Sequence, residues 1–189
     1  NNHDLAKEAY TSALEPIEFL VIEVPDQKTR WQRGIAITCY SIARVSEPKD
    51  AILLLDRGIK LARTVMKVES SNVRRPRDLA LMLSLRGKSH IESGNDIDAG
   101  VKDFKEAASM LTRRALESPR EAVTQQDFQE QFNTIVLVLH EAGQPQEAYE
   151  ICTDAIDQLE CIASAGSLTG SDTWLEMLDG LRLTMEYRK

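Results

Sequence analysis

A pattern of small and apolar residues occurs three times along this chain, at intervals of 48 and 49 residues. Each copy has a compact residue, a turn residue seven positions later, a small residue, a larger apolar residue four positions further on, and then a second small residue. In that order the copies are Cys39, Ser46, Ala51, Leu55 and Gly58; Gly87, Gly94, Gly100, Phe104 and Ala107; and Val136, Gly143, Ala148, Cys152 and Ala155. Small side chains let two antiparallel helices approach closely, and a large one fills the groove between them. The pattern therefore predicts repeated pairs of packed helices.

The residues at the ends of the predicted helices agree with this pattern. Gly94 and Gly143 can take the left-handed conformation that closes a helix. Pro48 and Pro145 stand at matching places just inside the following helix, where a missing N–H costs nothing. We expect an all-α protein with about eight helices, at roughly residues 3–23, 28–45, 48–68, 77–93, 97–117, 121–142, 145–163 and 172–188.

Three segments carry a resemblance to a known family. EAGQPQEAYEICTDAI, LRGKSHIESG and AKEAYTSALEP resemble the tetratricopeptide repeat (TPR) family. The resemblance implies a single domain, an antiparallel helical-hairpin solenoid with a half repeat at 3–23, repeats at about 28–68, 77–117 and 121–163, and a terminal helix at 172–188. The interval is longer than the usual 34 residues, so the helices or the linkers must be longer. Arg86 departs from the family, which favours an apolar residue at that position.

Composition and charge narrow the class of partner. The net charge is −7, and an acidic chain is a poor candidate for generic nucleic-acid binding, which needs basic surface. The three cysteines, Cys39, Cys152 and Cys161, are widely spaced, which predicts reduced core thiols in a cytoplasmic or nuclear protein. No stretch approaches 18 apolar residues, so no membrane span is expected. The chain starts with Asn1 rather than Met, which is consistent with a fragment of a longer array.

Catalysis has little support in the sequence. His140 and Glu141 begin a segment, HEAGQ, that lacks the second histidine of the zinc motif HExxH. His90 and His140 stand at near-equivalent places in two repeats, which is more typical of packing or groove-lining residues than of a ligand or a general base. We therefore expect no enzymatic activity, no metal and no cofactor.

The resemblance implies a first candidate site, a groove. In the TPR family the first helix of each repeat lines the concave surface, and that position here implies Arg33, Tyr40, Arg44, Leu81, Ser84, Lys88, Ile91, Glu130, Asn133, Leu137 and His140. The mixture of apolar, cationic and amide side chains suits an extended or helical peptide. The alternative is that some of these residues, Leu81 and Leu137 above all, pack against neighbouring repeats.

Charge placement gives a second candidate site. In a hairpin solenoid, linkers of one type lie on the same edge. The linkers that lead into first helices are basic, and the predicted basic edge comprises Arg30, Arg74, Arg75, Arg77, Arg113, Arg114 and Arg120. Such an edge would steer an acidic partner. The alternative is that these arginines are solvated charges that favour helix C-termini.

The sequence thus predicts a scaffold or adaptor that binds a protein or peptide partner and leaves the identity of that partner and the oligomeric state open. A second hypothesis is a regulatory sensor that controls an enzyme domain outside this chain. A third, weaker hypothesis is nucleic-acid contact through the basic edge, which a steep salt dependence of binding would indicate.

Overall fold

A computed structural model describes residues 2–69, 72, 75–94, 96–164 and 176–182. Over these residues the chain is helical and has no strand. The helices are α1 (Asn2–Glu23), α2 (Lys28–Ala43), α3 (Pro48–Val68), α4 (Arg75–Glu92), α5 (Ile97–Glu117), α6 (Ala122–Glu141) and α7 (Pro145–Ser164). A short 3₁₀ turn, Pro25–Gln27, joins α1 to α2, and residues 176–182 form a further helical segment. The prediction of an all-α protein is confirmed for the described residues.

The ends of the helices follow the turn chemistry of the sequence. Both ends of each of the first seven predicted helices lie within two residues of the predicted positions, whereas the eighth predicted helix, 172–188, is described only at 176–182. Gly94 and Gly143 follow α4 and α6 with φ of 67° and 72°, which only glycine adopts without strain. Pro48 begins α3, and the Asp96 carboxylate accepts a hydrogen bond from the Ala99 amide to cap α5.

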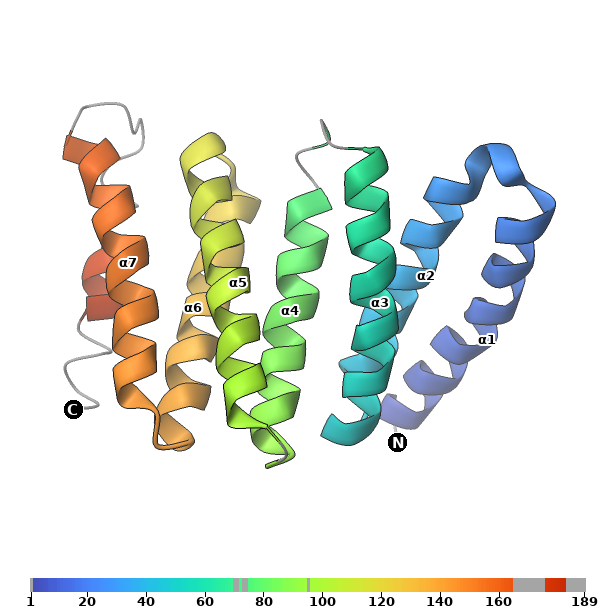
Figure 1. The fold of residues 1–189 in the computed structure, drawn as a ribbon, viewed down its shortest axis with the longest axis horizontal. Helices are drawn as coiled ribbons and strands as arrows, with labels where there is room; N and C mark the ends of the chain where they lie inside the picture. Colours follow the sequence, from blue (N-terminus) through green and yellow to red (C-terminus); the bar gives the residue numbers. More distant parts are fainter. Residues whose placement is uncertain (1, 70–71, 73–74, 95, 165–175, 183–189) are drawn as a thin grey trace.

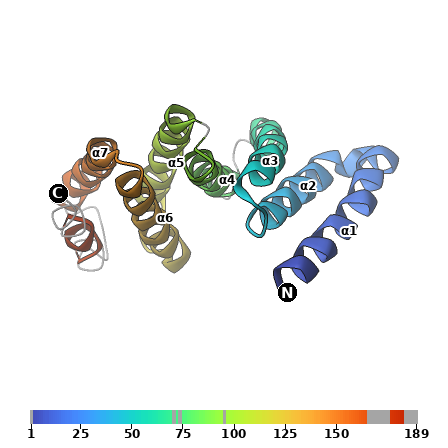
Figure 2. The same ribbon diagram turned by 90° about the horizontal axis from the view of Figure 1, so that it is seen from below.

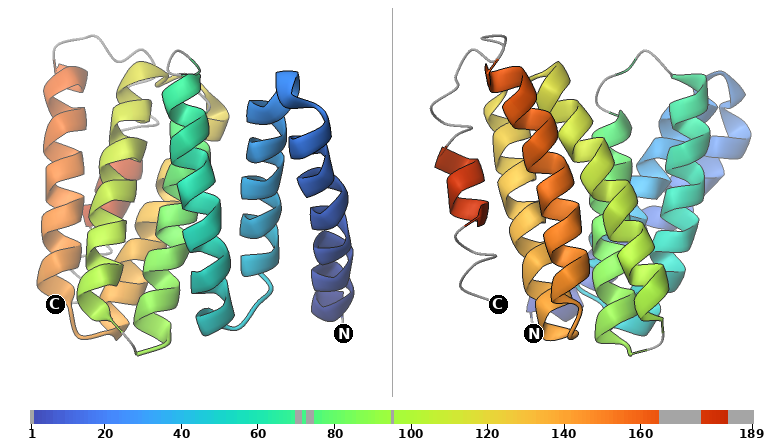
Figure 3. Two further views of the ribbon diagram at one scale, coloured as in Figure 1. Left: turned by 45° about the vertical axis from the view of Figure 1, so that its right-hand side comes forward. Right: turned by 60° about the vertical axis from the view of Figure 1, so that its left-hand side comes forward.

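The helices stand side by side in one row, with α1 at one end and α7 at the other (Figure 1). Each packs against the next in the sequence, and neighbours run in opposite directions. Figure 2 shows that the row has two layers, with α2, α4 and α6 in one and α3, α5 and α7 in the other. Within the layers, α4 also contacts α6 and α5 contacts α7. The same order of helices is seen from both directions in Figure 3.

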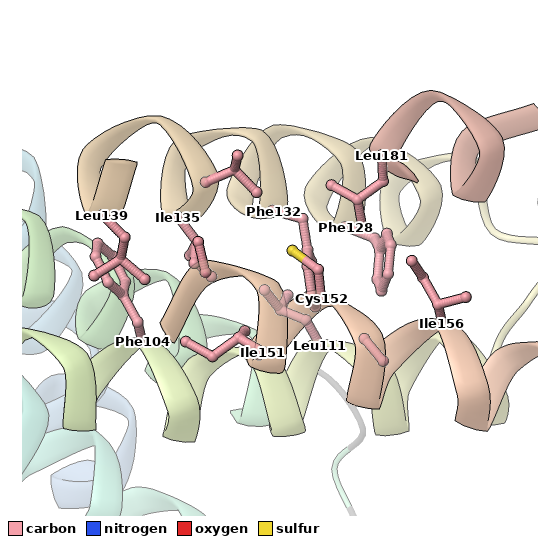
Figure 4. Packing of buried hydrophobic residues seen from close by; sticks show 14 of the residues in the cluster. Phe104, Leu111, Phe128, Phe132, Ile135, Leu139, Ile151, Cys152, Ile156 and Leu181 are labelled. Atoms are coloured by element: carbon pink, nitrogen blue, oxygen red, sulfur yellow. The ribbon is translucent and has the colours of Figure 1, made fainter. Parts of the chain in front are cut away.

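The interior contains two hydrophobic clusters that meet between α4 and α5. One lies among α2, α3 and α4 and takes Ala107 from α5. The other lies among α5, α6 and α7 and takes Ala80 from α4. Figure 4 shows this second cluster, in which α6 and α7 direct side chains toward each other and Leu181 of the terminal segment lies beside Phe128. Because each cluster draws on three successive helices and takes one residue from the adjoining helix, the core is continuous from α2 to α7.

The repeated residues of the sequence lie in the interior in all three copies. All twelve compact, small and larger apolar residues are buried, including the three glycines among them. The closest approach is between α4 and α5, where a Cβ on Gly100 would lie 2.9 Å from the Gly87 carbonyl oxygen. Small residues at these positions therefore set the distance between paired helices, as the pattern predicts.

Ion pairs connect helices that are two apart in the chain. In one layer Arg33 of α2 bonds Asp78 of α4, with Nε to Oδ2 at 2.9 Å. In the other layer three such links follow one another, namely Arg57 to Glu18, Arg63 to Glu106, and Lys105 to Glu147. Each layer is thus joined by side chains as well as by apolar contact.

Arg86, the departure from the family pattern, has a structural role between three helices. Its Nε and Nη2 both donate to Asp103 of α5 at 2.7 Å, and its Nη1 donates to Asp56 of α3 at 2.6 Å. These bonds raise the pKa of the guanidinium above its ordinary value, and the bonds to Asp103 contribute most. A residue that the sequence marks as an anomaly therefore anchors α4 to both of its neighbours.

Candidate functional site

A groove of about 490 Å³ runs across the layer of α2, α4 and α6. One of its residues comes from α2, one from the C-cap of α2, five from α4 and four from α6, in the order Tyr40, Arg44, Arg77, Leu81, Ser84, Leu85, Lys88, Asp127, Glu130, Gln131 and Thr134. Leu81, Leu85 and the Tyr40 ring give it apolar surface, and the remaining side chains are polar or charged. It is open to solvent along one side of the row.

Six of the eleven predicted groove residues line this groove, namely Tyr40, Arg44, Leu81, Ser84, Lys88 and Glu130. The other five lie elsewhere. Arg33 lines a second hollow beside Asp78, and Ile91 packs over the backbone of Gly100. Asn133 and Leu137 are exposed outside the groove, and His140 is half-buried.

The difference on α6 has a physical cause. Phe128 and Phe132, which stack with their ring centroids 4.1 Å apart, occupy the side of α6 that faces the core. Asn133 and Leu137 lie on the opposite, solvent side, about 100° around the helix from the groove-lining residues. The lining positions that the sequence missed on α6 are Asp127, Gln131 and Thr134. Their signal is their spacing of three and four from one another, which places them on one face.

Two cations stand at the α2 and α4 side of the groove. The Cζ atom of Arg44 lies 5.9 Å from the centroid of the Tyr40 ring, which is a cation–π distance. Arg44 is exposed to solvent. Lys88 lies 3.6 Å from the exposed Glu92, a weak surface pair. Burial raises the pKa of the Tyr40 hydroxyl above its ordinary value, so the ring remains neutral at physiological pH. These cations remain accessible to an acidic group.

Arg77 and Asp127 close one end of the groove. Arg77 donates to Asp127 from Nε at 2.5 Å and from Nη2 at 2.8 Å, and Asp127 is buried. The hydrogen bonds to Asp127 raise the pKa of Arg77. Their charges are therefore engaged with each other rather than offered to a ligand.

Ser84 lies within the lining of the groove and is 1% exposed. Its Oγ makes no hydrogen bond. A buried hydroxyl without a partner costs about 1–3 kcal/mol. The oxygen is covered by protein atoms, so it contributes no accessible polar group to the groove.

The arginines of the predicted basic edge are largely engaged with carboxylates. Arg75 pairs with Glu69, and Arg113 with Glu117. Arg77 and Arg114 both lie within ion-pair distance of Asp127. Of the other three, Arg30 lies 5.1 Å from the Trp31 ring, Arg120 is exposed, and Arg74 lies outside the described residues. The edge is therefore mostly a set of ion pairs, which offers less uncompensated charge than the sequence suggests.

The two described cysteines are buried thiols. Burial raises the pKa of the Cys39 and Cys152 thiols, that of Cys152 to about 12, and a protonated thiol is a poor nucleophile. Within the described part of the chain, no group of three or more histidine, cysteine, aspartate or glutamate residues is placed to hold a metal ion. The same residues contain no helix that is long and apolar enough to cross a membrane.

No family model and no curated protein matches this chain. Over the described residues, the fold is that of an all-α protein whose antiparallel helices form two layers.

Proposed function

We propose that this chain is a protein–protein interaction scaffold, a TPR-like solenoid that binds a segment of a partner protein in the groove between α2, α4 and α6. The observation that carries the proposal is the groove itself, because side chains from three alternate helices meet in it and six of them match positions implied by the family resemblance. In this proposal the chain catalyses no reaction. Buried, reduced thiols suit a reducing compartment, the cytoplasm or the nucleus.

Support for a solenoid comes from the repetition of equivalent contacts. The small residues of the three copies are all buried, and cation–carboxylate links join α1 to α3, α3 to α5, and α5 to α7. An arrangement in which each unit contacts mainly its neighbours is what a repeat protein requires. In this proposal the partner binds on the layer of α2, α4 and α6, where the groove lies.

The chemistry of the groove favours a peptide with an acidic residue. Arg44 and Lys88 can bind a carboxylate, while Leu81 and the Tyr40 ring can hold an apolar side chain nearby. Exposed Glu130, on the opposite wall, can accept from a donor on the same peptide. In this proposal, the cations on the α2 and α4 side and Glu130 on α6 orient the bound peptide across the groove.

The test uses peptides selected from a random display library against the purified chain, with affinity measured by fluorescence anisotropy. We expect the selected sequences to contain acidic residues next to an apolar one. We expect the double variant Arg44→Ala plus Lys88→Ala to weaken binding by roughly tenfold or more, since it removes two charge-assisted contacts.

Asn133→Ala is the matched control, because Asn133 lies on α6 but outside the groove. The control should bind the selected peptides as the parent chain does. If the double variant keeps full affinity, or if both variants lose it equally, the groove is not the binding site.

A further inference from the structure

A second hollow, of about 510 Å³, lies at the opposite end of the Arg77–Asp127 pair from the groove. It lies between the starts of α4 and α6, the last turn of α5 and one residue of α2. Its lining consists of Arg33, Arg77, Asp78, Arg114, Glu121, Ala122 and Val123. Three guanidinium groups thus surround one space. The hollow shares Arg77 with the groove but none of its other lining residues.

Arg114 is the most buried of these arginines, at 8% exposed. Its Nη2 donates to Glu121 Oε2 at 3.0 Å. Its Nη1 is buried and makes no hydrogen bond, and Asp127 Oδ2, at 3.5 Å, is close enough only for ion pairing. Nη1 is thus held against Asp127 inside the protein, and the bond from Nη2 to Glu121 is the contact that Arg114 makes with a residue lining the hollow.

The start of α6 faces the same hollow through Ala122 and Val123. Glu121 occupies the N-cap position, but its side chain does not cap the helix. Instead, its carboxylate accepts hydrogen bonds from Arg114 and from the Thr124 hydroxyl, at 3.0 and 3.2 Å. The first turn of a helix attracts anions through its amide groups and its dipole. Glu121, whose side chain is 55% exposed, therefore stands where an external anion would bind.

We propose that this hollow binds a phosphate group, free or carried by a side chain of a peptide partner, and that the phosphate takes the place of the Glu121 carboxylate. With Glu121 displaced, three arginines remain against the two more buried carboxylates, Asp78 and Asp127. An incoming carboxylate would only exchange one single charge for another. A phosphate monoester brings nearly two charges and three acceptor oxygens, enough for Arg114 and the α6 amides together.

The primary test is a titration with inorganic phosphate, followed through the amide NMR signals of Ala122 and Val123 at constant ionic strength. Saturable shifts at these two amides are expected. Glu121→Gln should tighten phosphate binding by roughly tenfold, because it removes the competing charge. The control Glu141→Gln, at an exposed position at the other end of α6, should leave the affinity unchanged.

Arg114→Gln should weaken phosphate binding by about tenfold or more. Because Arg114 is buried and its loss also perturbs folding, Glu121→Gln is the deciding variant. Shifts that do not saturate, or an equal response in Glu121→Gln and Glu141→Gln, would overturn the proposal.

The source of the phosphate is decided with a phosphoserine peptide and its unphosphorylated twin. Tighter binding of the phosphopeptide than of inorganic phosphate identifies a partner-borne group, whereas equal affinity identifies free phosphate, and both results support the site. Equal binding of the two peptides at the Ala122 and Val123 amides contradicts it. Phosphate binding here does not depend on a partner in the groove, so the two proposals can fail separately.

Discussion

Arg77 of α4 and Asp127 of α6 form a two-pronged ion pair across the helix layer, with Nε to Oδ2 at 2.5 Å and Nη2 to Oδ1 at 2.8 Å. The pair separates the groove from the hollow at the start of α6, since Arg77 lines both. It also has a counterpart between the preceding two helices of the same layer, where Arg33 of α2 bonds Asp78 of α4. Arginine–aspartate pairs therefore join α2 to α4 and α4 to α6.

Replacing Arg77 should destabilise the fold. Arg77→Ala leaves Asp127, which is 6% exposed, with only the 3.5 Å contact to Arg114. Because a buried carboxylate without its main partner is costly, we expect the free energy of unfolding to fall by about 2 kcal/mol. Urea denaturation monitored by circular dichroism measures the change. Arg113→Ala, which removes an exposed pair with Glu117, should cost less than about 0.5 kcal/mol, and an equal loss in both variants would refute the prediction.

The contact of Gly87 with Gly100 predicts a second stability effect. A Cβ on Gly100 would lie 2.6 Å from Ile91 Cγ1 and 2.9 Å from the Gly87 carbonyl oxygen, so α4 and α5 would have to separate. We expect Gly100→Ala to destabilise the protein by about 1–3 kcal/mol despite the better helix propensity of alanine. Gly180→Ala is the matched control, because a Cβ there meets no atom within 4 Å. Its melting temperature should be unchanged or higher, and a similar loss in both variants would show that close packing is not the cause.

The fold was accessible from the sequence because its strongest signals are local. Glycine turns, N-terminal prolines and spaced small residues depend on a few neighbouring positions, and the first seven helices accordingly end within two residues of their predicted bounds. The role of Arg86 was not accessible, since its partners Asp56 and Asp103 lie on two other helices. Pairing between helices depends on their rotation about their own axes, which periodicity fixes only loosely.

The candidate site shows the same limit. On α4, three of the five lining residues, Leu81, Ser84 and Lys88, are predicted groove positions, whereas on α6 only Glu130 matches. The paired rings of Phe128 and Phe132 lie on the core side of α6, and their spacing of four residues already indicates a shared face in the sequence. The basic edge appeared more strongly charged than it is, because the counterions Asp78 and Asp127 were overlooked. These two aspartates stand 49 residues apart, the repeat interval itself, and that spacing could have revealed them.

Arg86 and Asp103 allow a test that separates charge pairing from packing. Arg86→Leu leaves Asp103, 4% exposed, without its two hydrogen bonds, and we expect a loss of about 3 kcal/mol in unfolding free energy. Adding Asp103→Leu removes the stranded carboxylate, so the double variant should recover most of that loss. Chemical denaturation of the parent, both single variants and the double variant gives the coupling energy. Additive losses would contradict a direct interaction between the two side chains.

Cys152 predicts how stability changes at high pH. Burial raises its pKa from 9.0 to about 12 in the folded chain, so between those values the folded thiol keeps a proton that the unfolded chain has lost. The stability that the protonated Cys152 thiol contributes is fully present below pH 9. It is lost as the pH rises further, because the unfolded chain then binds fewer protons than the folded chain. This thiol should lower the free energy of unfolding by about 1.4 kcal/mol for each pH unit above 9. Urea titrations at pH 8, 9, 10 and 10.5 measure the slope, and the Cys152→Ala variant isolates it because other raised groups, such as Tyr40, remain in both chains. Parallel pH dependences for the parent and the variant would show that the thiol does not titrate in this way.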